Sequence, residues 1–169
     1  MTISPQISAI YIAPSAGVPM QALEQAELIP GLGIKGDRYA MGRGAFSKNV
    51  PPKIRHISLI TQAGIAIANE WLEVSEEPGF SDSETRRNIV LSNIAPAELN
   101  QLVGKMFFLG GIACKGTELC IPCQRPSKLA NKTNFMAAFE GRGGLRVEIL
   151  DAGFINIGDA LTYAAVISE

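Results

Sequence analysis

The chain has 169 residues, of which 47% are hydrophobic and 18% are charged. This length and composition predict one globular domain spanning residues 1–169 and exclude a disordered chain. The 15 basic and 16 acidic residues nearly cancel, so there is no overall positive charge to attract nucleic acid.

The sequence also predicts the cellular setting. The N-terminus lacks the basic and apolar regions of a secretory signal, and no apolar run approaches the roughly 18 residues of a membrane span. The cysteines are Cys114, Cys120 and Cys123, and an odd number argues against a disulfide-stapled secreted protein. We therefore expect a cytoplasmic protein with available thiols and with no membrane or nucleic-acid partner.

Short apolar runs, separated by many of the 17 glycines and 10 prolines, favour strands over helices. In chain order we expect strands over 7–12, 54–60, 88–91, 105–109, 112–117, 145–150 and 160–166. We expect helices over 61–74, 96–102 and 131–140, with Thr61 as the cap of the first and Gly141 at the end of the third.

Strands and helices do not alternate regularly along this chain, which disfavours a doubly wound parallel sheet. The pattern predicts a mainly β fold, namely a closed or nearly closed β-barrel with a few peripheral helices. The helix over 61–74 is expected to lie outside the barrel.

The sharpest local feature is Cys120-x-x-Cys123 followed by Arg125, in a loop that Pro122 and Pro126 stiffen. The thiolate is the reactive and metal-binding form of cysteine, and a nearby guanidinium favours it. One interpretation is therefore a functional thiolate that ligates or carries a group.

Three other interpretations of the cysteines remain open. A structural zinc site would need Cys114, Cys120, Cys123 and His56, because the second Cys-x-x-Cys pair of a zinc ribbon is missing. A thioredoxin-like redox pair would need a βαβ frame that the pattern does not predict. Inert buried cysteines are the third. His56, the only histidine, lies in an alternating strand, where a structural role is favoured over a catalytic one.

Three segments combine arginine with glycine or with the start of a strand. They are 31–44, which contains Arg38, 85–93, which contains Arg86 and Asn88, and 140–146, which contains Arg142. Arginine grips phosphate or carboxylate as a fork, and glycine lets the backbone approach a ligand closely. Solvated loops and simple hairpin turns explain the same segments, but we predict that Arg38, Arg86, Asn88 and Arg142 converge on one anion-binding cleft.

Taken together, these segments resemble the MOSC domain family, the C-terminal domain of molybdenum-cofactor sulfurases, in its small free-standing bacterial form. The resemblance runs from about residue 31 to residue 163. It is carried by Gly36-Asp-Arg-Tyr-Ala, His56-Ile-Ser-Leu-Ile, Arg86-Arg-Asn-Ile-Val, Leu102-Val-Gly-Lys-Met-Phe-Phe-Leu-Gly, Leu119-Cys-Ile-Pro-Cys, and Arg142-Gly-Gly-Leu-Arg followed by Ile157-Gly-Asp.

The resemblance implies a barrel-like β fold and a link to the molybdenum cofactor (molybdopterin) or to sulfur transfer. The cysteine that holds the metal in longer relatives is similar in position to Cys123, which implies Cys123 as metal ligand and catalytic residue. Cys120 is the second catalytic candidate. The implied cofactor-binding residues are Asp37, Arg38, Arg86 and Asn88, to which the glycine context adds Arg142. The chain is too short to hold also the N-terminal β-domain of those relatives or the pyridoxal-phosphate domain of the sulfurases.

We therefore expect a protein that binds the molybdenum cofactor, or carries sulfur, through a cysteine thiolate, as an oxidoreductase or a sulfur transferase. Its expected partner is a molybdenum-pterin or another sulfur-bearing small molecule. The alternatives are a non-catalytic module that delivers cofactor or sulfur to a partner enzyme, and a small structural zinc protein.

Overall fold

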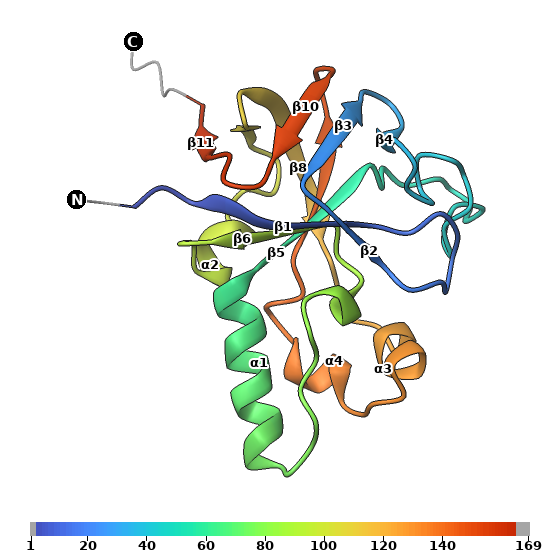
Figure 1. Cartoon of the computed structure of the whole chain (residues 1–169), viewed down its shortest axis with the longest axis vertical. Coiled ribbons are helices and arrows are strands. Elements are labelled where there is room, and N and C mark those ends of the chain that lie inside the picture. The colour runs from blue at the N-terminus through green and yellow to red at the C-terminus, as the bar shows by residue number, and fades with distance from the viewer. Residues whose placement is uncertain (1–2, 165–169) are drawn as a thin grey trace.

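The fold is dominated by a strongly curled, mainly antiparallel sheet of eight strands (Figure 1), seen in a computed structural model that describes residues 3–164. The strand order is β11-β7-β8-β9-β5-β6-β1-β2, and the only parallel pair in this sheet of described residues is β5 with β6. The strands are β1 (Gln6–Ile12), β2 (Gln21–Leu23), β5 (Ile57–Thr61), β6 (Ile89–Ser92), β7 (Met106–Leu109), β8 (Ile112–Leu119), β9 (Leu145–Ile149) and β11 (Leu161–Tyr163).

A second sheet of three strands lies beside the first, in the order β10-β3-β4. Its strands are β3 (Gln25–Ile29), β4 (Gly33–Ile34) and β10 (Gly153–Asn156). None of these three strands was predicted, and neither was β2. They are short and include polar residues such as Gln25 and Asn156, so the apolar runs that mark a strand in sequence are weak here.

The large sheet forms a half-barrel. The prediction of a mainly β fold with peripheral helices is confirmed, but the barrel is not fully closed. The two edge strands, β2 and β11, are only three residues long. On the open side, residues 5–7 meet residues 158–161 through a bridge between Gln6 and Ala160 and three backbone hydrogen bonds, but this pairing is not continued along β1 and β11.

Two hydrophobic cores lie on opposite faces of the large sheet, because successive strand residues point to opposite faces. Leu59 and Ile89 belong to the core inside the half-barrel, whereas their neighbours Ile60 and Val90 belong to the outer core. A strand that is buried on both faces has a continuous run of apolar residues in its sequence. Such runs allowed β5 and β6 to be predicted.

The helices flank the sheet: those at 62–74 and 135–138 pack into the outer core, whereas Leu99 of the helix at 96–100 belongs to the inner core. The helices are α1 (Gln62–Val74), the short 3-10 helix η1 (Ser83–Thr85), α2 (Pro96–Asn100), α3 (Arg125–Ala130) and α4 (Phe135–Ala138). Helix α1 lies outside the half-barrel as predicted (Figure 1), and the Thr61 hydroxyl oxygen accepts a 2.8 Å hydrogen bond from the Gly64 N–H.

The predicted helices differ from the observed ones in two places. The helix expected over 131–140 shortens to α4, because Asn131 and Asn134 adopt left-handed conformations with φ of 53° and 67°. Helix α3 was not predicted.

The strand expected over 160–166 is observed as β11, and residues 165–166 lie outside the described part of the chain. Among the described residues, no helix is long and apolar enough to cross a membrane.

Candidate functional site

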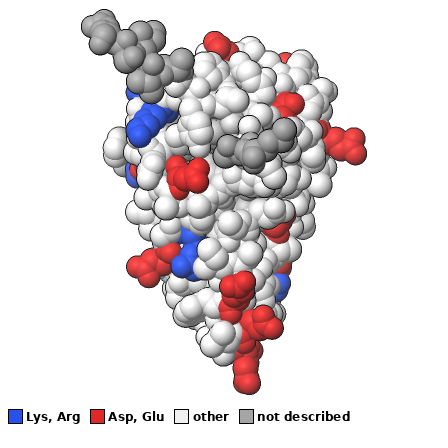
Figure 2. Space-filling view, turned by 90° about the vertical axis from the view of Figure 1, so that its left-hand side faces the viewer, with Lys and Arg blue, Asp and Glu red and all other residues white. Residues whose placement is uncertain are grey.

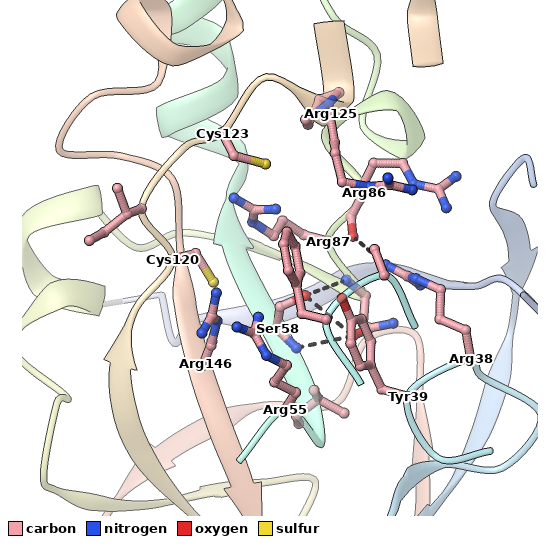
Figure 3. A pocket seen from close by; sticks show the side chains of 16 residues that line it. Arg38, Tyr39, Arg55, Ser58, Arg86, Arg87, Cys120, Cys123, Arg125 and Arg146 are labelled. Carbon is pink, nitrogen blue, oxygen red and sulfur yellow. Dashed lines mark hydrogen bonds between the residues drawn. The ribbon is translucent and has the colours of Figure 1, made fainter. Parts of the chain in front are cut away.

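One pocket gathers side chains from five separate segments of the chain (Figure 3), namely 38–46, 55–58, 86–88, 120–126 and residue 146. Four of the five segments lie on or beside β8, β9, β5 and β6, which are consecutive neighbours in the sheet, whereas 38–46 follows β4 of the second sheet. The cavity measures about 120 Å³, many times the roughly 10–15 Å³ that one water molecule needs on the same measure.

The lining of this pocket is strongly cationic. It includes six arginines, and no Asp or Glu is among the described residues that line it. The arginines are Arg38, Arg55, Arg86, Arg87, Arg125 and Arg146. Two cysteines, Cys120 and Cys123, line the same cavity. A positively charged lining of this kind favours anions, and the two thiols lie where they can contact a ligand in the cavity.

Arg38 is fixed by the residue before it in the chain. The fully buried Asp37 accepts a hydrogen bond from Arg38 Nη1 at 3.1 Å, and its two oxygens also accept the backbone N–H groups of Ala13 and Tyr39. Both oxygens of this buried side chain are thus held by hydrogen-bond donors. Asp37 does not line the pocket, so its geometry is that of a residue that positions Arg38.

Arg86 stands in an unusual backbone conformation, with φ of 66° at the end of η1. Its Nη1 donates a hydrogen bond to the Val18 carbonyl oxygen. Burial, and then the nearby cations Arg38 and Arg125, lower the pKa of Arg86 to about 10. The side chain is therefore still a cation at neutral pH, but one held among other cations, where an anionic ligand offsets the repulsion.

Asn88 lines the pocket, and its side-chain amide is already hydrogen-bonded to β5 and β1. Its Oδ1 accepts hydrogen bonds from the N–H and hydroxyl of Ser58, and its Nδ2 donates to the Tyr11 carbonyl oxygen at 3.0 Å. Asn88 thus ties β1 and β5 to the start of β6. Only one N–H of its amide remains for a ligand.

Arg87 and the cysteine loop both bond to the glycine turn before β9. Its Nε donates a 2.7 Å hydrogen bond to the Gly143 carbonyl oxygen, and the Cys120 N–H donates to the Gly144 carbonyl oxygen at 2.8 Å. A Cβ atom at Gly143 would overlap the Cys120 carbonyl oxygen. Glycine at 143 therefore lets the cysteine loop lie close to β9.

Arg55 and Arg146 form the opposite wall of the pocket. Arg146 Nη1 donates to Glu118 Oε1 at 2.5 Å, and the Arg55 guanidinium stacks 4.7 Å from the centre of the Phe46 ring. Burial, and then repulsion from Arg146, lower the pKa of Arg55. The Arg55 Nε is buried without a hydrogen-bond partner in the described structure, which is unusual for a polar atom of a native protein.

The three cysteines differ in their surroundings. Cys123 is partly exposed, and Figure 3 shows its sulfur on the side of the pocket that holds Arg87 and Arg125. Cys120 is buried, beside Arg146 and Arg55. Cys114 lies in the inner core, where burial raises the pKa of its thiol to about 12. Among residues 3–164 no three His, Cys, Asp or Glu side chains are placed to hold a metal ion together, so the zinc alternative finds no ligand set.

Two residues considered from the sequence lie away from the pocket. Arg142 does not line it, because its Nη1 donates to the Ala138 carbonyl oxygen at 2.7 Å, at the end of α4. His56 Nδ1 accepts the Ile149 N–H at 3.0 Å, and burial lowers the pKa of this imidazole. Arg38, Arg86 and Asn88 do come together, as expected of the cleft. Their role in binding a cofactor remains a prediction.

Sequence reasoning overlooked several residues of the pocket, above all Arg55 and Arg146. Arg146 alternates with the buried Leu145 and Val147 along β9, and it lies opposite Ser58 in the register with β5. That alternation places it on the other face of the strand from its neighbours, a signal readable from the sequence. No comparable signal marks Arg55, which precedes β5 in a loop.

The fold and the site define a small, mainly β domain with an arginine-lined, cysteine-bearing pocket on a half-barrel sheet. Residues 53–162 match the family described as the MOSC domain, and the chain therefore belongs to the MOSC domain family. The resemblance noted in the sequence is thereby confirmed. No curated protein matches the chain.

Solved structures share the fold at low sequence identity. The YUAD protein from Bacillus subtilis superposes with a TM-score of 0.76 and 18% identity, covering 96% of this chain and 98% of that one. YiiM from Geobacillus stearothermophilus gives a TM-score of 0.67 at 14% identity, over 95% of this chain and 75% of that one. YiiM from Escherichia coli gives 0.67 at 13% identity, over 99% and 72%.

Proposed function

We propose that the pocket binds an anionic molybdenum-pterin cofactor, with Cys123 as thiolate ligand to the metal. The residues present fit such a group. Thiolate is a soft ligand that suits a transition metal, guanidinium groups match phosphate, and a carboxylate that would repel an anion is absent from the described lining. Membership of the MOSC domain family supports the same choice of ligand.

The observation that carries the proposal is the excess of positive charge around the cysteines. Of the six arginines, Arg38 pairs with Asp37 and Arg146 with Glu118. The other four take part in no ion pair among the described residues, and one of them, Arg55, leaves a buried N–H without an acceptor. All four are partly buried. Partial burial and mutual repulsion disfavour cations held together without counterions, and a bound anion would offset that cost.

Each part of the pocket then has a distinct task. Arg86 and Arg87 would hold the anionic end of the cofactor, and Arg38, fixed by Asp37, would complete that grip. Cys123, which is partly exposed, would reach the metal. The bound cofactor would supply the redox or sulfur chemistry, while the chain binds, orients and shields it.

A sulfur-carrier role is the second candidate, and the position of Cys120 favours it. Cys120 lines the same cavity as Cys123. A thiol there can attack a persulfide on Cys123, which forms a disulfide between the two cysteines and releases the outer sulfur as hydrogen sulfide. In either role the protein would act itself or deliver its cargo to a partner enzyme.

The test is the content of protein purified from cells that make the cofactor. We expect molybdenum, measured by mass spectrometry of the metal, together with the fluorescence of the oxidised pterin. Cys123→Ser should lose the metal, and Arg87→Gln should lose both signals. Arg43→Gln is the matched control, because Arg43 is exposed and lies outside the pocket. Wild-type protein without metal or pterin, but with a sulfur atom on Cys123 in its intact mass, would favour the carrier role.

A further inference from the structure

Helix α1 presents an apolar stripe to the outside of the molecule. Ile67, Trp71 and Val74 have 42%, 44% and 87% of their surface exposed. They follow one another at spacings of four and three residues, so they share one face of the helix. The opposite face, with Ile65 and Leu72, is buried in the outer core. The exposed stripe therefore does not serve the fold of the domain.

The surroundings of this stripe are acidic. Residues 56–85 contain no Lys or Arg and six acidic residues: Glu70, Glu73, Glu76, Glu77, Asp82 and Glu84. Figure 2 shows acidic side chains gathered at the lower end of the molecule, the end at which α1 terminates in Figure 1. Glu84 is paired with Lys132 at 2.7 Å. Glu70, Glu73 and Glu76 are in no ion pair among the described residues.

We infer that this face of α1 is a docking surface for a basic, apolar segment of another protein. The stripe would pack against apolar side chains of the partner, and the glutamates would meet its Lys or Arg residues. Exposed apolar side chains at helical spacing that include a tryptophan are typical of helices that bind another protein. The inference uses no residue of the pocket and does not depend on the proposed function.

The negative charge of this face favours a basic protein segment over two other occupants, a second copy of the chain and a membrane. A second copy of the chain, docked through the same face, would place glutamates against glutamates, which is unfavourable in a symmetric contact. A membrane with anionic lipids would repel the same residues. A basic protein segment is attracted by both features of the face. The 13 residues of α1 span about 20 Å, enough for three turns of a partner helix.

The test uses Trp71, the only tryptophan of the chain, as its own reporter. The probe is an 18-residue amphipathic peptide helix of leucine and lysine, and its control is the same peptide with glutamate in place of lysine. We expect the lysine peptide to shift Trp71 emission to the blue, with an affinity that falls as salt rises. Glu73→Lys should weaken binding about tenfold, whereas Glu24→Lys, an equal charge change at an exposed site elsewhere, should leave it unchanged.

Ile67→Ser separates apolar docking from mere charge attraction. It keeps the reporter and the glutamates, and it should weaken binding of the lysine peptide severalfold. Equal binding of both peptides, no loss in Ile67→Ser, or an equal loss in Glu24→Lys would overturn the inference. So would a blue shift with vesicles of anionic phospholipid, or a dimer in sedimentation that Ile67→Ser dissociates, because these outcomes assign the face to a membrane or to a second copy.

Discussion

Arg38 Nη2 donates a 3.3 Å hydrogen bond to the backbone carbonyl oxygen of Arg86, although 48 residues separate the two. This contact joins the loop after β4 to the turn that leads into β6. It also keeps two guanidinium groups at one cavity, against their mutual repulsion. The hydrogen bond between Arg38 and Asp37 and the left-handed backbone of Arg86 hold the two guanidinium groups in place. A left-handed conformation is strained for a residue other than glycine, and such conformations cluster at functional sites.

Asp37→Asn is predicted to destabilise the protein strongly. The substitution keeps the size of the side chain but removes the charge that balances the buried Arg38. Breaking a buried pair in this way costs about 3–5 kcal/mol, which urea unfolding would show as a lower midpoint at unchanged slope. Glu27→Gln is the control, because its partner Lys35 is exposed and such pairs contribute about 0–1 kcal/mol. Equal losses in both variants would contradict the role assigned to Asp37.

The burial of His56 leads us to expect that the free energy of unfolding depends on pH. Burial lowers the pKa of His56 in the folded state below its usual 6.5. As pH falls below about 6.5, the unfolded chain therefore takes up a proton before the folded one does. The stability that neutral His56 provides is present above this pH and is lost as pH falls toward the folded-state pKa.

The measurement compares wild type with His56→Asn, whose amide oxygen can still accept the Ile149 N–H but does not titrate. We expect the free energy of unfolding of wild type to fall more than that of the variant between pH 8 and pH 5. Burial raises the pKa values of Glu84 and Glu118, but contacts with Lys132 and with Arg146 outweigh it, so the net shift is downward. These carboxyls therefore titrate mainly below this pH range. Parallel curves for the two proteins would show that His56 contributes nothing.

Gly143→Ala should disturb the cysteine loop. The new methyl group would overlap the Cys120 carbonyl oxygen, and relieving such an overlap costs about 1–3 kcal/mol. We expect faster alkylation of Cys120, because the loop must move away from β9. In the control Gly104→Ala, the added methyl meets open space at a φ of +76°, so about 1–2 kcal/mol of backbone strain arises without any change at Cys120.

The sequence predicted the strands of the large sheet that are buried on both faces, such as β5 and β6, because continuous apolar runs mark them. The small strand β4 (Gly33–Ile34) was overlooked, since two residues carry no periodicity. Arg38 and Arg86 were predicted for one cleft because arginine beside glycine or a strand is a local signal. The incorrect expectation that Arg142 would join them has the same origin. Arg142 bonds the end of α4 instead, and the direction of a side chain depends on tertiary packing.

The cysteines are predicted to differ sharply in reactivity, with Cys123 alkylated first, Cys120 more slowly and Cys114 last. Cys123 is partly exposed and Cys120 is buried at the pocket wall. Cys114 is fully buried, and burial raises the pKa of its thiol to about 12, so very little reactive thiolate forms at pH 8. The order is measured by mass spectrometry of peptides after timed exposure to iodoacetamide.

Arg125→Gln tests whether the arginines matter to the chemistry of Cys123. Removing this cation from the pocket should slow the alkylation of Cys123, because a nearby positive charge favours the thiolate. High salt should reduce the difference in the alkylation rate of Cys123 between wild type and variant, because salt screens the positive charge of Arg125. Arg43→Gln, which removes an exposed arginine outside the pocket, should change nothing. If Cys123 reacts no faster than Cys114 in the folded protein, or if both arginine variants behave alike, then Cys123 is a structural residue and the proposed function fails with it.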